Sequence, residues 1–293
     1  MSQSIHPIYD RIFKKIFTLS STAVINMING LFETDYPTDS TVTYNWTENV
    51  NEGLHMCLAD TILTIAGKYS YHLEAQISHD ENIVLRVFEY GFGHAQKQKS
   101  VALQTNDPLS PQTLYFPEPK VILLYDRPGT PDEYILNLDF GSQGTFPYKV
   151  STFKYLETTP EELTKKKLII LIPFELLKLR SAIQKERSKE NLSALQHLIF
   201  HDIIGAINMN LDAGNITIDD ARRLRRLTQK LYDHIYAHYD EMEDLNMMTD
   251  ESLLLDIDII EMEHEKEIAK IIEKKDAEIA ALKAEIELLK NDK

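Results

Sequence analysis

The sequence predicts an α/β core followed by a helical C-terminal region, and three observations carry this prediction. Segments with apolar residues at helical spacing alternate with segments of period-two alternation as far as about residue 187. The β pattern is absent from about residue 188 onward. Near the C-terminus, isoleucines recur every seven residues, which is the period of coiled coils.

Two helices and a strand open the predicted core. Apolar residues recur at helical spacing through residues 6–19, which predicts an amphipathic helix. A second helix is expected over residues 20–31, with a serine or threonine as its N-cap. A short strand is expected at residues 42–44.

Residues 58–78 carry the pattern of an antiparallel hairpin. Two β-rich runs flank a turn signal at Gly67-Lys68. In the second run the even positions are polar, so Glu74 and Gln76 share one face of a strand. A three-residue loop would pair Asp60 directly with Glu74, with Cβ atoms about 5 Å apart. Two carboxylates that close repel each other unless a cation lies between them, and a hard divalent ion is the usual occupant.

The rest of the core alternates in the same way, with a turn signal at residues 127–131. A helix is expected at residues 82–100 and a polar loop at 105–113. Strands are expected at residues 120–125, at 134–140 and within 146–155.

Helices are expected over residues 188–212 and 218–248. Beyond them the isoleucines fall at heptad position a, and mainly Ile and Leu at position d, which favours a parallel two-stranded coiled coil and a homodimer. With only about three heptads, a single exposed helix is the alternative. The predicted domains are a core at 1–187, a helical region at 188–250 and a coiled-coil helix at 251–293.

Composition indicates a cytoplasmic protein with no membrane partner. The longest apolar run, residues 168–174, is too short to span a bilayer and contains a proline. The N-terminus lacks a basic segment followed by an apolar one, so no secretory signal is expected. Cys57 is the only cysteine, which excludes an intrachain disulfide and a cysteine-rich zinc site.

The net charge of −15 belongs mainly to the C-terminal third. Residues 1–187 carry 18 Lys and Arg against 22 Asp and Glu, while the remainder carries 13 against 24. The core also concentrates lysines at 97–99 and 165–167. This distribution leaves DNA binding by the core open in spite of the acidic total.

Asp60, Glu74 and Gln76 resemble the active site of the PD-(D/E)XK nucleases. They resemble more closely the branch of recombination-promoting nucleases and putative transposases, in which Glu-x-Gln replaces Glu-x-Lys. The run Asp10-Arg-Ile-Phe-Lys14 is similar to the N-terminal Asp-x-x-Phe-Lys helix of that branch. The resemblance covers about residues 5–187 and implies a nuclease-like core, with a mixed sheet flanked by helices.

The resemblance implies a metal-dependent DNA endonuclease that hydrolyses phosphodiester bonds with Mg²⁺ or another divalent cation. Asp60 and Glu74 would hold the ion, and Asp10 would help to arrange the attacking water. Gln76 takes the place of the family's lysine, and its neutral amide can orient water but supplies no positive charge.

Three further residues have a binding role in this interpretation and a structural role in the alternative one. Lys14 would face the phosphate backbone, or it forms a surface ion pair with Asp10 one helical turn away. Arg86 and Tyr90 resemble residues of the helix after the catalytic strand; they would contact the substrate or fix that helix on the sheet.

The alternative function is a catalytically weak or inactive relative that acts as a coiled-coil DNA-binding or assembly protein. In that case Asp60, Glu74 and Gln76 are ordinary solvent-side residues of a half-buried sheet.

Because paired carboxylates repel each other, we expect replacing Asp60 or Glu74 by alanine to leave metal-free stability nearly unchanged.

Overall fold

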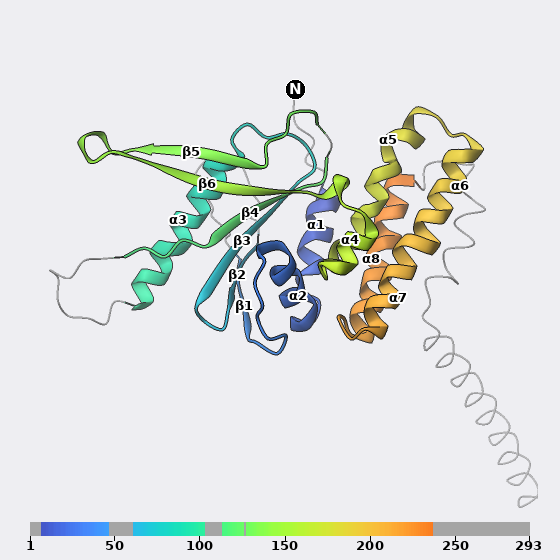
Figure 1. Ribbon diagram of the computed structural model, residues 1–293, viewed down its shortest axis with the longest axis horizontal. Coiled ribbons are helices and arrows are strands. Elements are labelled where there is room, and N and C mark those ends of the chain that lie inside the picture. The colour runs from blue at the N-terminus through green and yellow to red at the C-terminus, as the bar shows by residue number, and fades with distance from the viewer. Residues whose placement is uncertain (1–6, 47–60, 103–112, 126, 237–293) are drawn as a thin grey trace, which may run out of the picture. The chain divides into compact units, whose positions relative to one another are not determined.

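The computed structural model describes residues 7–46, 61–102, 113–125 and 127–236 (Figure 1). The chain divides into two compact units, Met1–Met242 and Glu243–Lys293, and every described residue belongs to the first. The predicted coiled coil therefore lies outside the described residues, as do the end of the predicted helix 218–248 and most of the predicted loop 105–113.

Six strands form one mixed sheet in the order β1-β2-β3-β4-β6-β5. Strands β1 to β3 are antiparallel neighbours, β4 runs parallel to both β3 and β6, and β5 pairs antiparallel with β6. The predicted α/β class with a mixed sheet flanked by helices is confirmed. The strands are β1 (Val42–Trp46), β2 (Thr61–Ile65), β3 (Tyr69–Gln76), β4 (Glu118–Leu123), β5 (Glu133–Asp139) and β6 (Thr145–Lys154).

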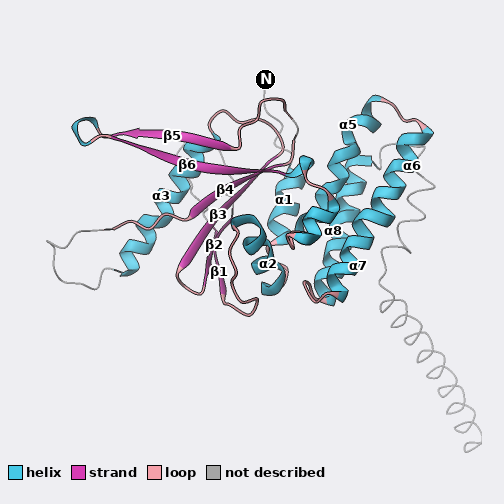
Figure 2. Cartoon of the chain, viewed as in Figure 1, coloured by secondary structure: helices cyan, strands magenta, loops and turns pink. Residues whose placement is uncertain are grey.

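Eight α-helices accompany the sheet in the described part of the chain (Figure 2). The hydroxyl of Ser20 accepts a hydrogen bond from the Ala23 amide at 3.2 Å, which confirms the predicted N-cap of the second helix. The helices are α1 (Pro7–Ile16), α2 (Ser21–Phe32), α3 (Ile83–Ala102), α4 (Pro160–Lys165), α5 (Leu177–Lys185), α6 (Lys189–His197), α7 (Ile204–Asp212) and α8 (Ile218–Tyr236).

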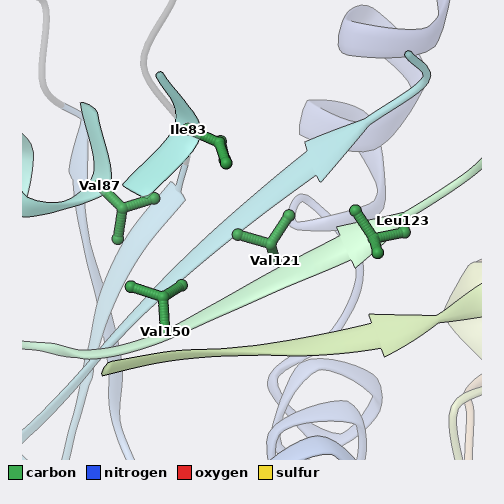
Figure 3. Packing of buried hydrophobic residues seen from close by; sticks show 5 residues of the cluster. All are labelled: Ile83, Val87, Val121, Leu123 and Val150. Carbon is green, nitrogen blue, oxygen red and sulfur yellow. The ribbon is translucent and has the colours of Figure 1, made fainter. Parts of the chain in front are cut away.

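Helix α3 covers one face of the sheet, and α2 lies against the other (Figure 1). On the α3 face, one apolar cluster joins the helix to β4 and β6 (Figure 3); its members are Ile83, Val87, Val121, Leu123 and Val150. On the opposite face, the ring centroids of Phe32 and Tyr71 lie 4.5 Å apart. Helix α3 therefore covers the face of β3 that carries the even-numbered side chains, because successive side chains of a strand point to opposite faces.

The helices after β6 pack around a buried apolar segment that the sequence left without an assigned element. Ile169–Leu176 forms a 3-10 helix whose residues are all buried. Pro173 lies inside it, and a proline within a helix cannot donate the backbone hydrogen bond that an α-helix needs. Helix α8 packs against this segment, and the Tyr236 hydroxyl donates to the carbonyl of Leu176 at 2.6 Å.

The predicted helix 188–212 is present but interrupted. A π-helical turn at Leu198–Ile203 separates α6 from α7, and it buries Leu198, Ile199 and Ile203. One extra residue per turn shifts the helix face, and here it keeps the apolar side chains directed at the core. Among the described helices, none is long and apolar enough to cross a bilayer.

Candidate active site

The β2–β3 hairpin has the predicted three-residue loop. Strand β2 ends at Ile65 and β3 begins at Tyr69, and the loop residues Ala66 and Gly67 adopt positive φ angles of 51° and 65°. The register pairs Thr61 with Leu73 at the far end of the hairpin. Asp60 lies outside the described residues, so its pairing with Glu74 stays a prediction.

Glu74 is buried between β3 and α3, with 1% of its surface exposed. Its Oε1 atom accepts a hydrogen bond from Gln76 Nε2 at 2.7 Å and pairs with the guanidinium of Arg86. Its Oε2 atom is buried and has no hydrogen-bond partner within the described part of the chain. The interpretation of Glu74 as a solvent-side residue is therefore wrong, because its face of the strand lies under α3.

Arg86 joins the start of α3 to the end of β3. One terminal nitrogen pairs with Glu74, and the other pairs with Asp80 at 2.6 Å. The other carboxylate oxygen of Asp80 accepts the amide hydrogen of Asn82 at 2.9 Å, just before α3 begins. Sequence reasoning missed Asp80, although an acidic residue ahead of a helix is a recognisable signal of its N-terminus.

A row of polar side chains continues from Glu74 along the interface of α3 and β3. The ring of Tyr90 meets that of His72 edge-on, with centroids 6.1 Å apart. One turn further along α3, His94 contacts Gln98 at 2.9 Å, and the Gln98 amide donates to Ser70 at 3.4 Å. Sequence reasoning missed the two histidines, although the four-residue spacing from Arg86 to Gln98 marks one polar face of the helix.

His72 is held neutral by its surroundings. Burial is the main cause, and the nearby His94 and Arg86 add to it, so that the pKa of His72 falls to about 3. Burial also lowers the pKa of His94. The row therefore places two uncharged imidazoles beside the Glu74–Arg86 ion pair.

This environment predicts acid sensitivity of the fold. The pKa of His72 is lower in the folded protein than the ordinary 6.5, so below about pH 6.5 the unfolded chain binds a proton that the folded protein does not. The free energy of unfolding is therefore highest above about pH 6.5 and decreases as pH falls toward 3. By urea unfolding between about pH 7.5 and about pH 4.5, we expect the parent to lose about 2–3 kcal/mol more than His72→Phe. Equal losses in both proteins would show that His72 does not carry the effect.

The two predicted residues of α1 belong to a helix that packs mainly against the helical region. Helix α1 lies along α8, and Phe13 contacts Phe174 with ring centroids 6.5 Å apart. Lys14 is half-buried on this helix; the side chain of Asp10 lies outside the described residues. Of the predicted site residues that the structure describes, Glu74, Gln76, Arg86 and Tyr90 are the ones that it brings together, at the α3–β3 interface.

The donor set at Glu74 fits one oxygen ligand of a hard divalent cation. Magnesium takes one or two protein carboxylates and completes its shell with water and phosphate oxygens. The Oε2 atom of Glu74 offers such an oxygen, because Gln76 and Arg86 engage only Oε1. Over residues 7–46, 61–102, 113–125 and 127–236, no three His, Cys, Asp or Glu side chains gather into a metal-binding group.

Comparisons with protein-family models, with curated proteins and with solved structures found no match for this chain.

Proposed function

We propose that this protein is a metal-dependent DNA endonuclease of the recombination-promoting nuclease and putative transposase type. The observation that carries the proposal is the state of Glu74: a buried carboxylate with Oε1 fixed by Gln76 and Arg86 and with Oε2 unpartnered among the described residues. A buried polar atom without a partner is costly. A divalent cation would remove that cost.

The arrangement of the elements supports the same proposal. The resemblance implies a nuclease-like core in which a mixed sheet is flanked by helices, and the six-stranded sheet with α2 and α3 on its two faces agrees with it. Glu74 and Gln76 lie on a central strand of that sheet, and Arg86 and Tyr90 lie on the helix that follows it.

Each side chain has a distinct part in the proposed chemistry. The chemistry that a divalent cation supplies is polarisation of the scissile phosphate and acidification of the attacking water. Arg86 holds Oε1 of Glu74 and so leaves Oε2 to face a cation. Gln76 can orient a water molecule through its amide, while Asp60 supplies the second carboxylate.

One observation favours the alternative, a relative without efficient catalysis that binds DNA or assembles through its C-terminal helix. The guanidinium of Arg86 already neutralises Glu74, and it also binds Asp80. In this alternative, the Glu74 carboxylate fixes α3 on the sheet and holds no cation. The two functions differ in whether Mg²⁺ is required for any activity on DNA.

Nicking of a supercoiled plasmid separates the two functions. The parent protein should nick the plasmid with Mg²⁺ and lose this activity with EDTA, and Asp60→Ala should be inactive under both conditions. A parent protein that binds the plasmid without nicking it at any Mg²⁺ concentration would establish the alternative. An Asp60→Ala variant with full Mg²⁺-dependent nicking would exclude this residue from the site.

Gln76 provides a second test. Gln76→Lys should retain nicking or increase it, because lysine supplies the positive charge that the amide lacks. Gln76→Leu should lose most of the activity, by roughly 10²-fold, since it can neither orient water nor donate to Glu74. If Gln76→Leu nicks as fast as the parent protein, Gln76 only supports the fold.

A further inference from the structure

A cavity of about 170 Å³ opens where the loop after β3 meets the loop after β4. It is lined by His79, residues 127–131 and Tyr134. We propose that this cavity binds a phosphate group of the nucleic-acid backbone, next to the site at Glu74. The proposal rests on the proposed endonuclease function and adds a second contact with the same substrate.

The lining of the cavity is suited to an anion. Arg127 is exposed, and its guanidinium stays charged and presents paired donors that match phosphate oxygens. Within the described residues, no carboxylate lines the cavity. Two acidic side chains close to the lining in sequence are paired with cations, Asp80 with Arg86 at 2.6 Å and Asp132 with Lys154 at 2.7 Å.

The loop that carries Arg127 is held in shape before any ligand binds. Both the amide and the hydroxyl of Thr130 donate to the carbonyl of Arg127, at 3.2 and 2.7 Å. Gly129 takes a φ angle of 79°, which glycine adopts without strain. The Thr152 hydroxyl of β6 donates to the Pro131 carbonyl at 2.8 Å, which ties the loop to the sheet. A fixed loop loses little entropy on binding.

The cavity lies at the carboxyl ends of the parallel strands, where ligands bind in α/β proteins. Strands β3 and β4 are parallel, and the Leu124 amide donates to the Gln76 carbonyl at 2.8 Å where both strands end. Crevices outside the carboxyl ends of parallel strands are the usual ligand sites of such sheets. Both the cavity and Gln76 are at these carboxyl ends.

Direct contacts connect the cavity with Glu74. His79, which lines the cavity, precedes Asp80, whose carboxylate pairs with Arg86, and Arg86 pairs with Glu74. Tyr125 interacts with residues of both places: burial raises its pKa to about 12, it hydrogen-bonds Tyr134, and the charges of Arg127 and Asp80 both act on it. A DNA strand positioned at Glu74 would therefore have a neighbouring phosphate within reach of Arg127.

DNA binding without cleavage tests this proposal. Fluorescence anisotropy of a short labelled duplex is measured with the full-length protein, with Ca²⁺ in place of Mg²⁺. Arg127→Gln should weaken binding by about 5–10-fold and reduce the slope of log K against log salt by about one, because one phosphate contact is lost. Arg187→Gln removes an exposed arginine between α5 and α6, and it should change binding by less than about twofold.

The outcomes separate this proposal from the proposed function. An Arg127→Gln variant with the affinity and salt slope of the parent protein would overturn the phosphate site, as would a parent that binds no duplex at micromolar concentration. If the parent fails to nick DNA but Arg127→Gln still weakens binding, the phosphate site stands and the endonuclease function fails. If Arg127→Gln nicks and binds like an active parent, the endonuclease function stands alone.

Discussion

Glu74→Gln is expected to reduce Mg²⁺-dependent nicking by at least about 10³-fold, because it removes the charge of the proposed metal ligand. Glutamine has nearly the same shape, and its carbonyl oxygen can still accept hydrogen bonds from Arg86 and Gln76. The fold should therefore survive the substitution. Initial nicking rates of the parent and variant, at equal concentrations and over a range of Mg²⁺, measure the effect.

Glu74→Ala should behave differently from Glu74→Gln in stability. The sequence alone suggested that removing a like-charged carboxylate would leave stability unchanged, but Glu74 is ion-paired with Arg86. Alanine would leave the half-buried guanidinium with Asp80 alone, at a cost of about 2 kcal/mol. Urea unfolding without metal should rank the parent above Glu74→Ala, with Glu74→Gln between them. Parent-like nicking by a folded Glu74→Gln would remove Glu74 from the chemistry.

Gly30→Ala is expected to destabilise the protein by about 3 kcal/mol or more. A Cβ atom at this position would lie 2.0 Å from the carbonyl oxygen of Lys166 and 2.9 Å from a methyl carbon of Leu168. The nearer contact is with backbone, so α2 would have to move away from the segment that follows α4. Thermal or urea unfolding of the full-length variant measures the loss.

Gly205→Ala is the matched control for Gly30→Ala. Gly205 also lies in a helix, α7, but no atom outside its own helix backbone and chain neighbours lies within 4 Å of its would-be Cβ. The substitution should raise stability by roughly 0.5–1 kcal/mol, since alanine favours the helix more than glycine does. If Gly30→Ala changed stability as little as Gly205→Ala, the close approach of α2 to Lys166 would be refuted.

Local pattern was sufficient to predict the elements of the core. The hairpin register from Thr61 to Tyr69 follows from the turn at Ala66–Lys68 and from period-two alternation. The N-cap at Ser20 follows from the preference of hydroxyl side chains for helix starts. These features depend on neighbours within a few residues, so they can be predicted from the sequence.

Features that depend on packing between distant segments could not be predicted in the same way. The polar face of β3 suggested exposure to solvent, but α3 buries Glu74 and His72 under a matching polar face of its own. The 3-10 segment at Ile169–Leu176 has no periodicity because it is buried on all sides by α8 and its neighbours. In both cases a second element decides the burial.

Binding of Mn²⁺, which shares the preference of Mg²⁺ for carboxylate oxygen, tests the central claim that Glu74 and Asp60 together hold a divalent cation. The free ion is titrated by electron paramagnetic resonance against the parent protein, Glu74→Gln and Asp60→Asn. We expect saturable binding by the parent and at least about tenfold weaker binding by each variant. A parent that binds no Mn²⁺ at millimolar concentration, or variants that bind it as tightly as the parent, would contradict the claim.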